Sequence, residues 1–171
     1  MRAYHFVGAT LRDGRPVPPD GEWLVHDGPL KMCESGLHAS IHPFDALNYA
    51  PGETLCLVDL DGEIVTEGDK SVATKRRIVA RINAAEMLWT FARLCASGVL
   101  HRWDAPQVVK DYLTTGDETL RAAAWDTAWD AARDAAWAAA WDAACDAARD
   151  VQRARFATLV NKLFEGVTHA S

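Results

Sequence analysis

The stretch Thr54-Leu-Cys-Leu-Val-Asp-Leu60, followed by Asp61-Gly62, decides the fold class of this chain. Its leucines alternate with Cys56 and Val58, so both faces of the segment are apolar over the length of an ordinary strand. Asp-Gly is a strong turn signal. The stretch therefore predicts a buried strand over residues 54–60, with residues 63–66 continuing after a turn.

Shorter strand-like segments precede this strand. Residues 4–7, 22–26 and 37–40 are separated by turns rich in glycine and proline. Residues 71–82 contain well-spaced apolar positions and several bases, which predicts either a last strand or a basic edge. Together these segments predict a small, mostly antiparallel sheet.

Helical patterns dominate the rest of the chain. A brief helix is expected over residues 43–49, and Asn83-x-x-Glu86 can cap a longer helix that ends before Gly98. Another helix is expected over residues 106–113. The fold class is therefore α+β, with a sheet followed by a helical layer. We expect two regions, a small α+β domain at 1–82 and a helical region at 83–171.

The helical region contains a tract, residues 122–150, built largely from the tetrad Ala-Ala-Trp-Asp. Neither glycine nor proline interrupts residues 117–165, and Thr115-x-x-Glu118 resembles a capping box, so the tract predicts one long Ala/Trp-rich helix or a helical hairpin. Each tetrad advances about 400° around a helix, so like residues drift by roughly 40° per repeat. No single surface can then bury all the tryptophans. We predict a homo-oligomer held by Trp125, Trp129, Trp137 and Trp141, with packing inside one chain as the alternative.

Composition indicates a soluble chain of 171 residues with a formal net charge of −6. The four cysteines lie far apart, and no signal peptide or apolar span is evident. We therefore expect a cytoplasmic, reduced protein without a membrane partner. Residues 69–81 are basic and residues 117–150 are acidic, so the overall charge does not identify the partner.

Three motifs occur in order along the N-terminal region: Cys33-x-x-Gly36-Leu37-His38-Ala39, Pro43-x-Asp45-x-Leu47-x-Tyr49 and Gly68-Asp69-Lys70. Over residues 4–82 this string resembles an uncharacterised domain family frequent in bacteriophages, whose members join the domain to repetitive C-terminal segments. The resemblance implies a phage or prophage origin and the host bacterial cytoplasm as location. It supplies no catalytic residues.

A weaker resemblance is to ADP-ribosyltransferases, in which an early strand and a Gly-x-His strand build the cleft for NAD. This resemblance implies that His5 and His38 contact the nicotinamide ribose. It also implies that Ser40 and Tyr49 complete the pocket and that Glu63 or Glu53 stabilises the oxocarbenium-like centre. The candidate catalytic residues are His5, His38 and Glu63.

A basic strip suggests a phosphate-binding rim, with three consecutive bases at residues 75–77; its members are Lys70, Lys75, Arg76, Arg77 and Arg81. Successive strand residues alternate between faces, so at least one of the three bases can turn toward a cleft beside His38. A solvated edge is the alternative. No aromatic residues alternate with the bases, which counts against nucleic acid. The candidate ligand-binding residues are Tyr4, His38, Ser40, Tyr49, Lys75, Arg76 and Arg77.

Simpler interpretations compete with these sites. His38 can be a strand histidine satisfied by a backbone carbonyl, and free cysteines such as Cys33 are usually only buried. His5, His38 and His42 are possible metal ligands, but no helical register brings His38 and His42 together and no further ligand stands out, so no metal is expected.

The sequence thus favours an accessory binding protein, which recognises a host factor or a phosphate-bearing small molecule. No cofactor is expected. An NAD-using ADP-ribosyltransferase and a structural or assembly protein are the alternatives.

Overall fold

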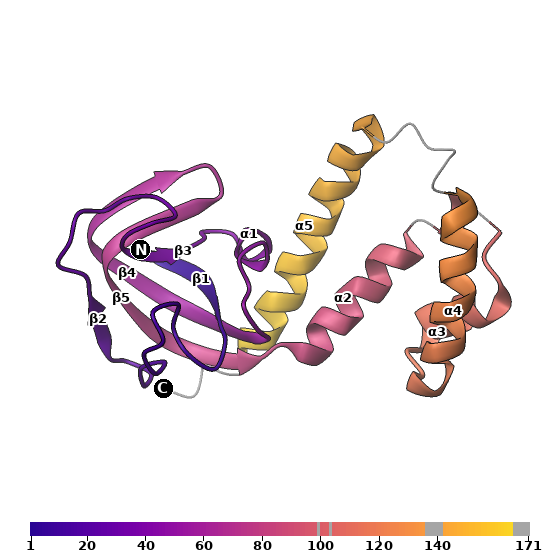
Figure 1. Cartoon of the computed structure of the whole chain (residues 1–171), viewed down its shortest axis with the longest axis horizontal. Helices are drawn as coiled ribbons and strands as arrows, with labels where there is room; N and C mark the ends of the chain where they lie inside the picture. Colours follow the sequence, from indigo (N-terminus) through magenta and orange to yellow (C-terminus); the bar gives the residue numbers. More distant parts are fainter. Residues whose placement is uncertain (99, 103, 136–141, 166–171) are drawn as a thin grey trace. The chain divides into compact units, whose positions relative to one another are not determined.

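The computed structural model describes residues 1–98, 100–102, 104–135 and 142–165, with the side chains at 102, 129–135 and 142–148 excepted (Figure 1). An antiparallel sheet with helices confirms the α+β class. The chain divides into two compact units. The sheet unit comprises Met1–Glu86 together with the chain from Phe156 onward, and the helical unit is Met87–Arg155. The sequence predicted one boundary after residue 82, whereas the structure groups residues 156–165 with the sheet.

The sheet has five strands: β1 (Arg2–Val7), β2 (Trp23–Val25), β3 (Leu37–Ala39), β4 (Thr54–Glu67) and β5 (Lys70–Asn83). Every pairing is antiparallel, in the order β1-β4-β5-β2, and β3 also pairs with β5. β5 is therefore an inner strand with neighbours on both sides, and the basic-edge interpretation of this segment is wrong.

A backbone bridge closes the sheet into a small barrel. Tyr4 N donates to Ser40 O at 2.8 Å and Ser40 N donates to Tyr4 O at 2.9 Å, which joins the end of β3 to β1. Pairing then runs from β1 through β4, β5 and β3 and back to β1, and β1 and β3 lie side by side in Figure 1. The inner face of the sheet carries one apolar cluster of Ala3, Val7, Ala39, Cys56, Val58, Leu60, Ala73 and Ile78.

β4 does not end at Asp61-Gly62 as the sequence predicted. The strand continues to Glu67, and its register with β5 shifts between Asp61 and Ile64. Gly62 has φ +75°, and a Cβ there would collide with the Thr74 hydroxyl, which instead accepts a hydrogen bond from Glu63 N at 3.0 Å. Because glycine tolerates this conformation, the chain makes a bulge within the sheet in place of a turn.

Aromatic residues of the C-terminal helix complete the sheet unit. In α5 (Asp142–Glu165), Phe156 and Val160 are fully buried. The Phe156 ring lies 5.9 Å edge-on from Phe44 of α1 (Pro43–Leu47), and the Phe164 ring lies 6.5 Å from Tyr4 of β1. These contacts explain why the end of α5 groups with the sheet.

The helical unit contains most of α2 (Ala85–Ser97), η1 (Leu100–Arg102), α3 (Gln107–Thr115), α4 (Glu118–Ala135) and the start of α5. Asn83 Oδ1 accepts from Ala85 N at 2.8 Å at the start of α2, which is the asparagine half of the predicted capping box.

The predicted capping box at Thr115 and Glu118 does not form. Thr115 is the last residue of α3, which Gly116 terminates with φ +70°, and Asp117 Oδ1 caps α4 by accepting from Thr119 N at 2.9 Å. The glycine stops one helix because it adopts the left-handed conformation, and the aspartate then starts the next.

The described parts of the Ala/Trp tract lie in α4, up to Ala135, and in α5, from Asp142 onward. Trp137, Trp141 and the side chain of Trp129 lie outside the described residues. Trp125 is 68% exposed. The oligomer contact therefore stays a prediction. Among the helices that the structure describes, none combines the length and the hydropathy that a membrane span requires.

Candidate functional site

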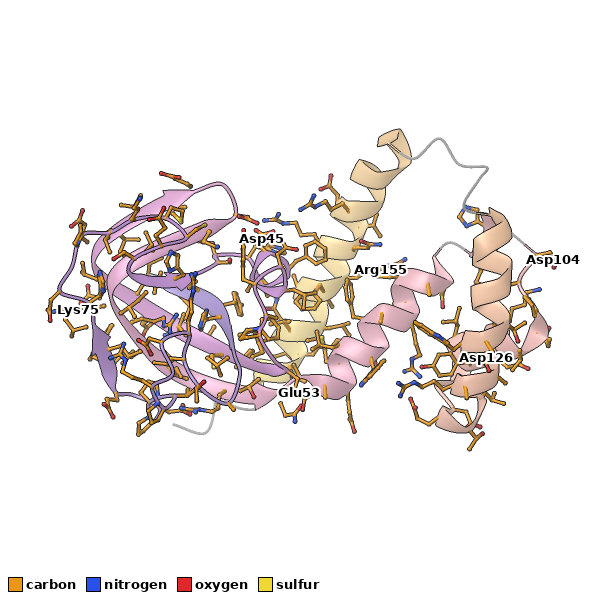
Figure 2. The ribbon with its side chains drawn as sticks, viewed as in Figure 1. Asp45, Glu53, Lys75, Asp104, Asp126 and Arg155 are labelled. Carbon is orange, nitrogen blue, oxygen red and sulfur yellow. The ribbon has the colours of Figure 1, made fainter. Side chains whose placement is uncertain are left out.

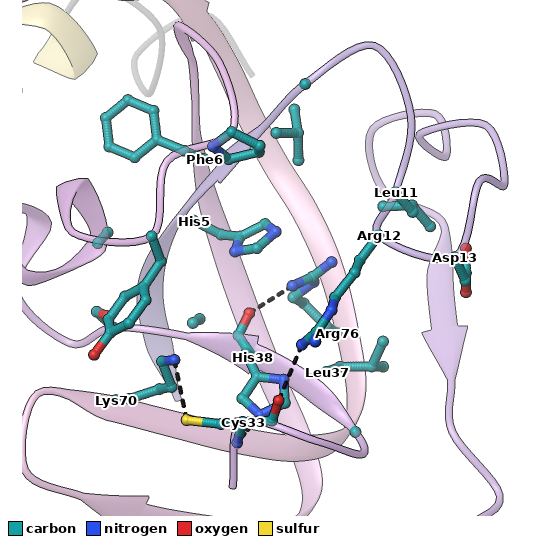
Figure 3. A pocket seen from close by; sticks show the side chains of 18 of the residues that line it. His5, Phe6, Leu11, Arg12, Asp13, Cys33, Leu37, His38, Lys70 and Arg76 are labelled. Carbon is teal, nitrogen blue, oxygen red and sulfur yellow. Dashed lines mark hydrogen bonds between the residues drawn. The ribbon is translucent and has the colours of Figure 1, made fainter.

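A pocket of about 960 Å³ lies in the sheet unit (Figure 3). β1 contributes His5, β3 contributes His38 and β5 contributes Arg76 to its wall. Residues 8–13 and 33–36 form the adjoining loops. A volume of this size is typical of sites for small organic molecules and far exceeds that of one phosphate ion.

Arg76 is the central cation of the pocket. It is only 5% exposed, and its Nη1 donates to the His38 carbonyl oxygen at 2.5 Å. Among the described residues it forms no ion pair with a carboxylate. Burial lowers the pKa of Arg76 to about 10, so the guanidinium stays charged at neutral pH. A buried charge without a counterion is costly, and an anionic ligand would supply one.

Two further cations line the same pocket. Arg12 Nη1 donates to the Cys33 carbonyl oxygen at 3.0 Å. Lys70 Nζ lies 3.4 Å from Cys33 Sγ and 3.4 Å from the centroid of the Tyr49 ring. Neither cation pairs with a carboxylate within the part of the chain that the structure describes. Their positive charge therefore adds to that of Arg76.

The carboxylates that line the pocket are already paired with neighbouring cations. Asp13 contacts Arg15 at 2.7 Å, and Glu34 contacts Lys31 at 2.6 Å. The Arg15 side chain holds the pKa of Asp13 below its usual value through a hydrogen bond. The pocket thus retains the uncompensated charge of Arg12, Lys70 and Arg76.

His5 presents an uncharged imidazole to the pocket. Burial, followed by the nearby Arg76 and His38, lowers its pKa well below the usual 6.5. Its ring makes no hydrogen bond with any residue that the structure describes. A neutral imidazole offers one donor and one acceptor, so His5 is suited to an uncharged polar group of a ligand.

His38 is oriented by the chain around it. The Cys33 amide donates to His38 Nε2 at 3.0 Å, which leaves the ring proton on Nδ1. Burial and then Lys70 lower the pKa of His38. Gly36 has φ +113°, and a Cβ there would collide with Val72 and Leu30. The glycine of the Gly36-Leu37-His38 motif is therefore required for the entry of β3 into the sheet.

Acidification is expected to destabilise the fold through His5. Because the folded-state pKa is depressed, the unfolded chain binds a proton near pH 6.5 before the folded chain does. The contribution of neutral His5 to the free energy of unfolding is therefore fully present above that pH. It decreases as pH falls toward the pKa of the folded state, by up to about 1.4 kcal/mol per pH unit for each extra proton that the unfolded chain binds. Urea unfolding at several pH values between 7 and 5 measures this slope. It should decrease in His5→Gln, and identical slopes in both proteins would contradict the assignment.

The structure brings most of the predicted site residues together. The predicted site residues that line the pocket are Tyr4, His5, His38, Ser40, Tyr49 and Arg76. Arg76 is thus the one base of the run 75–77 that reaches the cleft beside His38.

Arg77 and Lys75 lie elsewhere. Arg77 pairs with Asp59 at 3.0 Å and stacks over Trp23, and Lys75 is exposed on the outer side of the sheet (Figure 2). Both residues are adjacent to Arg76 on β5. Because successive side chains of a strand point to opposite faces, theirs point away from the pocket.

The candidate glutamates are also outside the pocket. Glu63 lies in the bulge of β4, and the Glu53 carboxylate accepts from Asn83 Nδ2 at 3.3 Å (Figure 2). Lys70, which the sequence placed in the basic strip, lines the pocket. The sequence did not identify Arg12 as a site residue, because Arg12 comes from a loop without a recognisable pattern.

The third candidate metal ligand, His42, has a local role: its Nδ1 accepts from Phe44 N at 3.3 Å and caps α1. Within the described residues, no group of three His, Cys, Asp or Glu side chains is placed to hold a metal ion.

Comparison with known proteins identifies the N-terminal part of the chain. Residues 1–90 match the model of a domain of unknown function, DUF7666. No curated protein and no solved structure matches the chain. The sequence resemblance to an uncharacterised domain family agrees with this match, while the bacteriophage association stays a prediction. Because the matched residues make up more than half of the chain, the protein belongs to the DUF7666 family.

Proposed function

We propose that this protein binds a small organic phosphate in the pocket and releases it unchanged. The observation that carries the proposal is Arg76, a buried cation that lines the pocket without a carboxylate partner among the described residues. Each charge-assisted hydrogen bond from such a group to a phosphate contributes about 1.5–3 kcal/mol. Arg12 and Lys70 add to the attraction.

The pocket also has room and chemistry for the organic part of the ligand. Leu11 and Leu37 give it apolar wall, and His5 offers an uncharged donor and acceptor. Together with the volume of about 960 Å³, these features favour a ligand of nucleotide size over an inorganic ion.

The biological setting follows from the sequence resemblance. A phage or prophage protein acting in the host bacterial cytoplasm would use such a pocket to sequester or sense a host metabolite. A host protein remains the other class of partner. The structural or assembly alternative rests on the helical region alone and leaves the three cations of the pocket unexplained.

We also propose that the helical region holds copies of the chain together. Trp125 is 68% exposed, and Trp89, which lies 4.6 Å from the Arg121 guanidinium, is 50% exposed, so association of copies could bury both indoles. Light scattering of the full chain should give a mass above that of a monomer, and Trp125→Ala should lower it. A monomeric wild-type chain would contradict self-association.

An NAD-consuming enzyme is the alternative use of the same pocket. His5, His38 and Tyr49 line it, as that reading requires. Neither Glu53 nor Glu63 does, and Glu34, which does line it, is paired with Lys31. An oxocarbenium-like centre would lack a free carboxylate nearby, so the geometry favours binding over turnover.

Calorimetry at low salt tests the proposal. Inorganic phosphate, pyrophosphate, AMP, cyclic AMP and NAD are titrated separately, and each ligand is then recovered and identified by chromatography. At least one organic phosphate should bind more tightly than inorganic phosphate, weaken as salt rises and return intact. Release of nicotinamide from NAD would support the enzyme instead. No heat with any ligand would shift the function to protein recognition.

A further inference from the structure

A short loop at the rim of the pocket, residues 31–35, is closed on itself by backbone hydrogen bonds. Lys31 N donates to Ser35 O at 2.9 Å, and Ser35 N donates to Lys31 O at 2.8 Å. Cys33, between them, is exposed and has φ +66°, a conformation that is unfavourable for a residue other than glycine. We call residues 31–35 the strap. Because its own conformation is unfavourable at Cys33, contacts with the rest of the protein must hold it in place.

Four pocket residues provide these contacts: His26 Nε2 lies 3.0 Å from the Ser35 hydroxyl oxygen, and the other three residues meet Cys33 (Figure 3). Arg12 donates to its carbonyl oxygen at 3.0 Å, Lys70 Nζ lies 3.4 Å from its sulfur, and its amide donates to His38 Nε2 at 3.0 Å. Two of the three cations that make the pocket positive are thus engaged by a carbonyl and a thiol of the strap.

We propose, on the basis of the proposed function, that binding of a phosphate-bearing ligand releases the strap. Anionic phosphate oxygens are stronger acceptors for Arg12 and Lys70 than a neutral carbonyl or a thiol. A ligand that recruits both cations takes two of the three contacts from Cys33. The strap and the ligand then compete for the same side chains, and occupancy of the pocket is converted into a change at the protein surface.

Competition predicts that weakening the strap strengthens binding. Cys33→Ala removes the sulfur that engages Lys70 and leaves the backbone contacts in place, and alanine and cysteine are comparably unfavourable at positive φ. With pyrophosphate as the probe, the affinity of Cys33→Ala should rise about threefold over that of the wild type. Cys95→Ala, which removes a thiol from α2 outside the pocket, is the matched control and should bind as the wild type does.

Amide hydrogen exchange supplies a second measurement on the unaltered chain. Saturation with pyrophosphate should accelerate exchange of the Cys33 amide, which donates to His38 outside the strap. Slower exchange, or pyrophosphate binding with neither faster exchange nor tighter binding by Cys33→Ala, would overturn the strap and leave the binding function intact. Absence of pyrophosphate binding by both the wild type and Cys33→Ala would overturn the strap proposal, and the binding function would be overturned as well if no organic phosphate bound.

Discussion

Phe156→Ala is expected to lower the free energy of unfolding of the sheet unit by about 3–5 kcal/mol, the usual cost of removing a fully buried phenylalanine. Phe156 is 0% exposed and packs edge-on against Phe44 at 5.9 Å. It is brought to the sheet from a position far along the sequence. Urea unfolding followed by the fluorescence of Trp23 and the other tryptophans measures the change.

A control on the same helix separates packing from helix propensity. Val151 of α5 is 49% exposed, so Val151→Ala should change the free energy of unfolding by less than about 0.5 kcal/mol. A chain that ends after Glu86 lacks Phe156 altogether and should be poorly soluble, because its apolar surface is uncovered. A loss below about 1 kcal/mol in Phe156→Ala would show that the end of α5 does not contribute to the core.

Arg76→Met is expected to reduce affinity for an organic phosphate by at least about tenfold, and to do so without destabilising the fold. The tenfold loss corresponds to about 1.4 kcal/mol, the lower end of what one charge-assisted hydrogen bond contributes. Methionine keeps an unbranched chain in the pocket wall while removing a buried charge that has no carboxylate partner among the described residues. Because the substitution removes the cost of burying this charge, the free energy of unfolding should stay unchanged or increase.

Arg77→Met is the matched control for this substitution. Arg77 is the next residue on β5, but it pairs with Asp59 and stacks over Trp23 outside the pocket. Its loss should leave affinity within about twofold of the wild type, by calorimetry at constant salt. Equal losses in both variants would indicate a general electrostatic effect of positive charge in place of a site built on Arg76.

Local pattern predicted most of the strands and helices correctly. The strand beginning at Thr54, the motif strand at residues 37–39 and the helix that starts at Pro43 all lie where apolar spacing and capping residues placed them. One error occurred where a dipeptide that commonly forms a turn adopts another conformation. Asp61-Gly62 forms a bulge because β5 continues to pair with the chain beyond it, and a partner strand is not visible in a local pattern.

The sequence predicted some of the residues that line the pocket and missed others. Alternation on a strand correctly required one base of the run 75–77 to face the cleft, but only pairing with β4 and β2 decided that it is Arg76. Arg12 belongs to a loop and enters the pocket through its contact with Cys33, which lies 21 residues away. No spacing rule links such positions.

By itself, the sequence determined the α+β class and the order of the elements, because hydrophobic periodicity and helix caps are properties of neighbouring residues. The tertiary structure alone decided which cations share a pocket, which of them lack a carboxylate partner, and that Phe156 completes the core of the sheet unit. Charge pairing and burial depend on residues brought together from distant parts of the chain, and such contacts form only when the sheet closes.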